Sequence, residues 1–264
     1  MEIKRIKLKT LKNTRDLGGF IGADNRKIKA KRLIRSGQLG KASDADIKVL
    51  TDSYNLKTIV DLRMDAEVKE VPDKKPDGVN YIRFPLLDNS YLGIARDEYS
   101  LQSWLKVFED SSLSPEQLFG EMYVKILMSD RVVPMISEFF DLLINNKEGS
   151  VLWHCSAGKD RVGVVTSLVL SALGVDRETI IEDYLMTDYF SRSITLKAHI
   201  FLPLKIKDAK IRKCIYVLLG VKREYMENIF SIIDRDYGST ENFLSERFGI
   251  DEEKINKLRK NYLE

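Results

Sequence analysis

The residues best suited to chemistry lie in one short segment, from Val151 to Gly163. It contains Cys155 and, six positions later, Arg161, with Gly158 in the stretch between them. Apolar residues precede the cysteine, and a helix-compatible sequence begins near the arginine. This pattern predicts a strand, a short glycine-containing loop and a helix. Such a loop wraps successive backbone N–H groups around an anion at the helix N-terminus.

These residue types suit phosphoryl transfer. A cysteine beside a helix N-terminus is favoured as the thiolate, which is the nucleophilic form. The guanidinium of Arg161 is a planar, permanently charged fork that matches two phosphate oxygens. Attack by Cys155 on phosphorus would give a thiophosphate that water then hydrolyses, while the loop amides stabilise the equatorial oxygens. The sequence therefore predicts a phosphate-transfer site that needs neither a metal ion nor a cofactor.

The elements that position this loop alternate between strands and helices, and this alternation predicts an α/β domain. Short β-branched runs predict strands over residues 32–35, 57–62, 79–84 and 150–154. N-cap residues and apolar spacing predict helices from Ser43 through Leu50, from Ser114 to about Met128, over residues 139–143, from Asp176 through Tyr189, over residues 225–233, and from Ser239 and Asp251 onward. The apolar residues between positions 187 and 222 follow no clean helical period. This stretch could be a cap or lid over the site, but a plain helical subdomain is slightly favoured.

The composition excludes several classes of protein. The chain has 264 residues, of which 44% are hydrophobic, and this excludes a wholly disordered chain. Its net charge of +3 suits an anionic substrate but is too small to predict nucleic acid as a partner. Two cysteines are too few for a disulfide framework or a structural zinc site. With no visible signal peptide and no apolar run of bilayer length, we expect a cytoplasmic protein without integral membrane segments, while secretion without a signal peptide stays open.

The signature loop of cysteine-dependent protein tyrosine phosphatases resembles one string of this chain, His154-Cys155-Ser156-Ala157-Gly158-Lys159-Asp160-Arg161. The string is similar in particular to the bacterial branch of atypical tyrosine and dual-specificity phosphatases, which also acts on phosphoinositides. Flanking segments match as well, over residues 13–19, 33–37, 59–63, 183–187 and 237–244. The resemblance therefore covers most of the chain, and it implies a tyrosine-phosphatase-like central sheet flanked by helices, with extra C-terminal helices.

The resemblance also implies roles for individual residues. Cys155 is the expected nucleophile, and Lys159 would add a cation at the mouth of the site that favours highly anionic head groups, unless it is a solvated loop lysine. The residues expected to bind phosphate are Ser156, Ala157, Gly158, Lys159, Asp160 and Arg161. The residues expected to support the loop are His154, Arg15, Asp16, Asp61 and Arg63, the last two as an ion pair.

A general acid must protonate the leaving oxygen. The chain has no convincing Trp-Pro-Asp segment upstream of the loop, so Asp160 within the loop is the first candidate. Asp88, which follows a predicted strand end, is the second. The alternative role for Asp160 is structural, as a helix N-cap or in an ion pair with Lys159.

One position departs from the family pattern. A serine or threonine usually follows the loop arginine, and its hydroxyl helps to stabilise the sulfur as it leaves. Here the residue is Val162, and Thr166 lies one helical turn further on, too far to substitute. We therefore expect slower hydrolysis of the phosphoenzyme rather than an inactive enzyme.

These observations predict a single phosphatase domain over residues 1–264, with residues 187–222 as a candidate cap or lid insertion and residues 223–264 as C-terminal helices. The expected reaction is hydrolysis of phosphomonoesters, mainly on phosphotyrosine proteins, with phosphoserine, phosphothreonine and phosphoinositides as further substrates. One alternative is a phosphate-recognising module with weak turnover, and another is a rhodanese-like sulfurtransferase, whose loop usually lacks the Gly-Lys-Asp-Arg ending. Residues 239–260 resemble a helix-turn-helix, but their acidic side chains would repel a nucleic acid.

Overall fold

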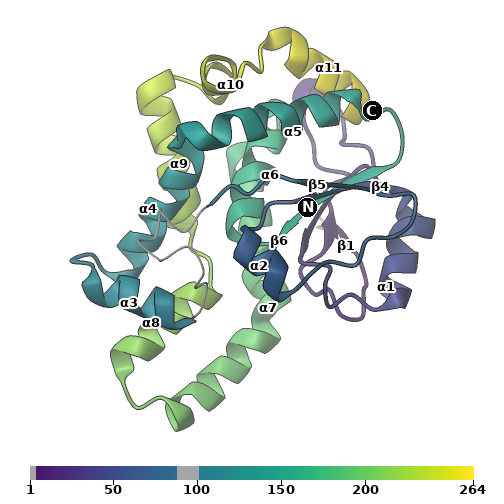
Figure 1. Cartoon of the computed structure of the whole chain (residues 1–264). Helices are drawn as coiled ribbons and strands as arrows, with labels where there is room; N and C mark the ends of the chain where they lie inside the picture. Colours follow the sequence, from purple (N-terminus) through teal and green to yellow (C-terminus); the bar gives the residue numbers. More distant parts are fainter. Residues whose placement is uncertain (1–3, 88–100) are drawn as a thin grey trace.

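The computed structural model describes residues 4–87 and 101–264, and Figure 1 shows their arrangement. The described strands form a six-stranded sheet in the order β1-β2-β3-β6-β4-β5. The strands are β1 (Lys4–Arg5), β2 (Arg15–Asp16), β3 (Leu33–Gly37), β4 (Leu56–Asp61), β5 (Asn80–Arg83) and β6 (Ser150–Cys155). β3, β6, β4 and β5 are parallel, whereas β1 and β2 are added antiparallel at one edge. The fold is therefore mixed α/β with a tyrosine-phosphatase-like central sheet.

All four strands predicted from the sequence are present. They correspond to β3, β4, β5 and β6, and each boundary lies within two residues of the prediction. β1 and β2 have two residues each, which is too short for an alternating pattern to be recognised.

The sheet separates two hydrophobic cores. Leu152 of β6 belongs to the smaller core, which α1 (Asp44–Lys48) and the π-helical turn Val49–Ser53 cover. Its neighbours Val151 and Trp153 belong to the larger core on the opposite face. Successive side chains of a strand point to opposite faces, so both faces of β6 are buried. This explains why Val151, Leu152 and Trp153 are consecutive large apolar residues.

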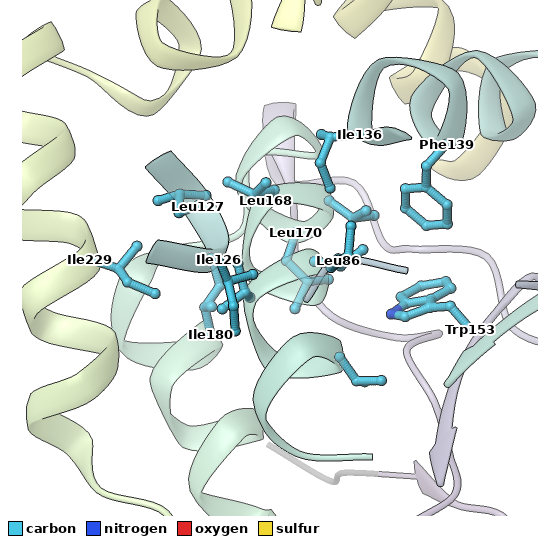
Figure 2. Close-up of a cluster of buried hydrophobic side chains, with 14 of the residues drawn as sticks. Leu86, Ile126, Leu127, Ile136, Phe139, Trp153, Leu168, Leu170, Ile180 and Ile229 are labelled. Carbon is cyan, nitrogen blue, oxygen red and sulfur yellow. The ribbon is translucent and has the colours of Figure 1, made fainter. Parts of the chain in front are cut away.

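The larger core is built around α6 (Asp160–Ala172), in which eleven of the thirteen residues are buried. Figure 2 shows Leu168 and Leu170 of this helix among side chains from the surrounding elements. Trp153 of β6 packs edge-on against Phe139, with ring centroids 5.7 Å apart. A helix that is buried on nearly all sides cannot shift easily, so the core fixes the position of its N-terminus beside the cysteine.

The other helices are α2 (Asp65–Glu70), α3 (Leu101–Asp110), α4 (Pro115–Met128), α5 (Val133–Asn145), α7 (Arg177–Lys205), α8 (Ala209–Leu219), α9 (Arg223–Tyr237), α10 (Thr240–Phe248) and α11 (Glu252–Tyr262). The predicted N-caps are confirmed, because a side-chain oxygen accepts a backbone N–H at Ser43, Ser114, Asp176, Ser239 and Asp251. α2 and α3 were not predicted, whereas α8 lies within residues 187–222, which were expected to be helical but without defined helix bounds. None of the helices in the described part of the chain combines the length and the apolar character that crossing a membrane requires.

α7 extends well beyond its predicted end. It begins after Asp176 as expected, but it continues past Tyr189 to Lys205, with Pro203 inside its last turn. The outer half of the helix, from residue 191 onward, contains no buried residue. Helical periodicity in a sequence comes from burying one face of the helix, so this half gives no such signal.

Candidate active site

Cys155 lies at the carboxyl end of the central strand β6, which runs between β3 and β4. The three strands are parallel, and Gly37 at the end of β3 lies directly opposite the cysteine. Ligand sites of parallel sheets form at this edge. The side chain of Cys155 is buried, and the loop of residues 156–159 leads from it into α6. The predicted order of strand, loop and helix is therefore confirmed.

Gly158 allows the loop to turn against the end of β3. Its φ is +70°, in the left-handed region that favours glycine. A Cβ atom at this position would lie 2.6 Å from both the backbone nitrogen of Gly37 and the carbonyl oxygen of Ser36. Both neighbours are backbone atoms that cannot rotate away, so a side chain at position 158 would displace the loop.

Two polar side chains hold the loop through its carbonyl groups. The amide of Asn13 donates to the carbonyl oxygens of Ala157 and Gly158, each over 3.0 Å. Arg35 of β3 also donates to the Gly158 carbonyl, over 3.0 Å. These contacts fix the orientation of the peptide groups in advance of binding. Such preorganisation lets a loop of this kind stabilise an anion without reorganising.

A buried carboxylate connects these supports. Asp183 of α7 lies 2.7 Å from Nε of Arg15 and 2.6 Å from Nη1 of Arg35. Arg15 in turn donates to the side-chain oxygen of Asn13 over 2.5 Å. Burial raises the pKa of Asp183, but the charges and hydrogen bonds of the two arginines outweigh it and hold that pKa below its usual range. Burial, together with the charge of Arg35, lowers the pKa of Arg15 to about 10.

Arg161 is held by a glutamate from another part of the chain. Its Nη1 and Nη2 atoms lie 2.5 and 2.7 Å from the two carboxylate oxygens of Glu67, on α2. Ser156 in the loop donates a hydrogen bond to the same carboxylate. Burial raises the pKa of Glu67, but the charge of Arg161 and the hydrogen bonds from Arg161 and Ser156 lower it below its usual range. Glu67 thus fixes the guanidinium in the first turn of α6.

A second buried polar cluster surrounds the residue before the cysteine. Arg63 lies 2.9 Å from a carboxylate oxygen of Asp61 and 2.6 Å from one of Asp73. Nε2 of His154 lies 3.0 Å from Asp73, and Tyr81 donates to Asp61 over 2.5 Å. In the described part of the chain, Asp61, Asp73 and His154 are a group that could hold a metal ion, with ligand atoms within 4.8 Å of one another. Arg63 already contacts both carboxylates, so a cation there would be repelled by its charge.

Lys159 and Asp160 contact each other. Nζ of Lys159 lies 3.1 Å from Oδ1 of Asp160, donates to the carbonyl of Gly220 over 3.0 Å, and lies 5.0 Å from the centre of the Phe119 ring. Tyr123 of α4 donates to the same Asp160 oxygen. The ion pair weighed as the alternative role of Asp160 is therefore present. Lys159 is only 5% exposed, so it is not a solvated loop lysine.

The residues that follow Arg161 pack into the core. Val162 is fully buried. The hydroxyl of Thr166 accepts the indole N–H of Trp153 over 3.0 Å, so it serves the packing of β6 against α6. The second candidate for the general acid, Asp88, lies outside the described residues.

Asp16 is positioned by the segment that joins β2 to β3. It accepts the backbone N–H groups of Gly18 and Lys31, over 2.9 and 2.8 Å, and so ties together the two ends of that segment. Its neighbour Arg15 reaches the loop indirectly, through Asn13.

Sequence reasoning did not single out several residues that hold the loop, namely Asn13, Arg35, Glu67, Asp73, Tyr123 and Asp183. Asn13, Arg35 and Asp183 lie within segments that resemble the family, so polar residues inside those segments were an available signal. Glu67 lies on α2, a helix of six residues without an apolar period, and nothing in the sequence marked it.

Comparisons with known proteins agree with this geometry. Residues 6–264 match the model of the tyrosine phosphatase family. A Cupriavidus necator protein, provisionally named as a tyrosine-protein phosphatase, is 30% identical over 261 residues that cover 96% of this chain and 86% of that protein. The triple specificity protein phosphatase PtpB of Mycobacterium tuberculosis is 28% identical over 262 residues, which cover 88% of this chain and 91% of PtpB. A tyrosine-protein phosphatase of Nostoc commune is 30% identical over 165 residues, which cover 62% of this chain and 50% of that protein. The chain therefore belongs to the tyrosine phosphatase family, as a protein tyrosine or dual-specificity phosphatase.

Proposed function

We propose that this phosphatase hydrolyses phosphomonoesters through a phosphocysteine intermediate. In the first step the thiolate of Cys155 attacks phosphorus, and the bond to the leaving oxygen breaks as the phosphorus–sulfur bond forms. Arg161 binds two phosphoryl oxygens, and the loop N–H groups stabilise the charge on the equatorial oxygens. The leaving oxygen takes a proton from the general acid and departs as a phenol or an alcohol.

The second step releases inorganic phosphate. Water attacks phosphorus, the phosphorus–sulfur bond breaks, and Cys155 leaves as the thiolate. The residue that acted as the acid now accepts a proton from the water. Val162 has no hydroxyl to offer the departing sulfur, so this step is the slower one in the proposal. The nucleophile and the positive charge both come from side chains, and neither step therefore requires a metal ion.

Asp160 is the proposed general acid. It is the first residue of α6 and directly precedes Arg161, and its side chain is 17% exposed. Tyr123 and Lys159 both contact its Oδ1 atom and hold the carboxyl group in one orientation. A purely structural Asp160 would make the same contacts, so the two roles are distinguished by how the rate depends on the leaving group.

The observation that carries the proposal is the held loop between Cys155 and Arg161. Its backbone is fixed by Asn13 and Arg35, and Glu67 fixes its arginine. A phosphate-recognising module with weak turnover would use the same loop, and Val162 is the one feature that favours it. A sulfurtransferase would not need an oriented guanidinium, so we rank it below both.

Phosphotyrosine proteins are the proposed main substrates, with phosphoserine, phosphothreonine and phosphoinositides as further candidates. The family description supports phosphotyrosine, and the words triple specificity in the name of the PtpB relative support more than one class of substrate. The expected preference for highly anionic head groups rested on Lys159. Because that ammonium is packed against Asp160 and Gly220, the geometry gives this preference no support.

A substrate panel tests the proposal. We expect kcat/KM to be highest on phosphotyrosine peptides and lower on phosphoserine peptides, phosphothreonine peptides and phosphoinositides. Activity should be unchanged by a chelator, should be competitively inhibited by vanadate, and should be lost in Cys155→Ser. Retained activity in that variant, or complete loss in the chelator, would contradict the mechanism. Turnover of thiosulfate and cyanide would favour the sulfurtransferase instead.

A further inference from the structure

The outer half of α7 and the start of α8 form a hairpin that extends away from the sheet, at the lower edge of Figure 1. We call residues 191–213 the projecting hairpin. The inner half of α7 contributes Ile180, Ile181, Tyr184 and Phe190 to the buried interior, whereas no residue of the projecting hairpin is buried. The hairpin is therefore held to the rest of the molecule mainly at its base.

Exposed apolar side chains concentrate on this part of α7. In the described structure seven large hydrophobic side chains are exposed, and six of them lie between Tyr189 and Leu204. Leu196, Ile200 and Leu204 are 63%, 53% and 70% exposed, and their spacing of four residues places them along one side of the helix. A contiguous exposed apolar patch of this kind marks an interaction surface rather than ordinary surface composition.

The same hairpin is strongly basic. It contains one acidic residue, Asp208, and seven basic ones, Arg192, Lys197, Lys205, Lys207, Lys210, Arg212 and Lys213. Its net charge is therefore 7 − 1 = +6, whereas the whole chain has a net charge of +3, so all the remaining residues together carry 3 − 6 = −3. Asp208 is occupied as the N-cap of α8. Lys213, at the end of the hairpin, is paired with Glu116 of α4 over 3.2 Å. The apolar patch is thus accompanied by an excess of positive charge within the hairpin.

We propose that the projecting hairpin docks on the surface of an anionic lipid bilayer. Apolar side chains that enter the interface, accompanied by lysine and arginine that contact anionic head groups, are the composition of segments that lie on membranes. A second copy of this chain is a poorer occupant, because a symmetric contact would bring two hairpins of charge +6 together. An acidic protein surface would match the charge of the hairpin, but a bilayer offers both anionic head groups and an apolar interior for the exposed side chains of α7.

The base of the hairpin adjoins the catalytic loop. α8 is followed by Gly220, whose carbonyl oxygen accepts a hydrogen bond from the ammonium of Lys159 over 3.0 Å. The next residue, Val221, donates its backbone N–H to the side chain of Asp188 in α7 over 3.1 Å. The base of the hairpin therefore connects the proposed docking surface with the catalytic loop. The docking itself does not depend on catalysis, so it can be tested separately from the proposed function.

Vesicle co-sedimentation of the full chain tests this inference. The probes are phosphatidylcholine vesicles with and without phosphatidylserine. We expect binding to the anionic vesicles that weakens steeply with salt, and little binding to phosphatidylcholine alone. Lys205→Ala and Lys207→Ala should each weaken binding roughly fivefold. The triple variant Leu196→Ser, Ile200→Ser and Leu204→Ser should reduce binding at least as much as the two lysine substitutions combined. Its melting temperature should stay unchanged, because these three side chains are exposed.

Matched controls lie outside the hairpin. Ile21→Ser removes the seventh exposed large hydrophobic side chain, which is 43% exposed, and Lys27→Ala and Lys41→Ala remove exposed lysines. These variants should bind vesicles like the wild type, and so should the inactive Cys155→Ser. Absence of wild-type binding, or equal losses in the hairpin and control variants, would overturn the inference. Self-association that the triple serine variant abolishes would also overturn it, in favour of a second copy as the occupant.

Discussion

Replacing Asp183 by asparagine should be among the most destabilising single changes in this protein. The carboxylate is 1% exposed and lies 2.7 Å from Arg15 and 2.6 Å from Arg35, which are themselves 0% and 1% exposed. Asparagine has almost the same shape, but it leaves two buried guanidinium groups without a counter-charge. Removing one partner of a buried ion pair typically costs about 3–5 kcal/mol. We expect a loss of that size in the free energy of unfolding.

Urea unfolding followed by circular dichroism measures this loss. The midpoint should fall with little change in the m value, and the melting temperature should decrease by roughly 6–20 °C for a chain of this size. The matched control is Asp234→Asn, which removes a carboxylate from an exposed pair with Arg177 and should cost less than about 1 kcal/mol. Equal losses in the two variants would refute the assigned role of Asp183.

The pH dependence of stability provides an independent test of the same contact. Burial raises the pKa of Asp183, but the charges of Arg15 and Arg35 outweigh it, so this pKa is lower in the folded chain than in the unfolded one. The stabilisation is therefore complete above the ordinary aspartate pKa of about 3.9, and it is lost as the pH falls through the lower folded value. Below about pH 4 the wild type should lose stability more steeply than Asp183→Asn, and parallel curves would contradict the assignment.

Three further predictions concern catalysis. Glu67→Gln removes the charge that holds Arg161 and should lower kcat/KM on a phosphotyrosine peptide roughly 10- to 100-fold, so an unchanged value would argue against that contact. Asp160→Asn should slow substrates with alkyl or phenyl leaving groups by about 10²–10⁴-fold and spare those with acidic leaving groups, whereas a uniform loss would indicate a structural role. Val162→Thr supplies a hydroxyl and should speed phosphoenzyme hydrolysis, seen as a smaller burst in rapid-quench kinetics. An unchanged burst would count against a slow second step.

The parts of the fold that could be predicted are those with a local signal. The helices after Ser114 and Asp176 begin where the N-cap residues indicated, because capping depends on neighbours three or four positions away. β6 could be predicted because both of its faces are buried, which requires an unbroken apolar run. The loop from Cys155 to Arg161 could be predicted because its chemistry and its geometry are encoded in eight consecutive residues, starting at His154.

The rest depends on contacts between distant segments. Asn13, Arg35 and Asp183 lie in three separate segments of the sequence, and only folding brings them together around the loop. The same is true of Lys159, for which the sequence left open a cation at the site or a solvated loop lysine, and which lies against Gly220, more than sixty residues away. A single sequence contains no measure of such distances, so it did not single out Asn13, Arg35 or Asp183, and it did not show what Lys159 touches.

The central claim is that Cys155 carries the phosphoryl group, and trapping the intermediate tests it most directly. The enzyme is denatured rapidly during turnover of a radiolabelled phosphotyrosine peptide, and the labelled site is located by digestion. If Cys155 carries the phosphoryl group, we expect label on the fragment that contains Cys155 and no label in Cys155→Ser. Cys214→Ser, which changes the other free cysteine, should retain the label. Turnover with no trapped label in the wild type, or label on a fragment without Cys155, would contradict the account.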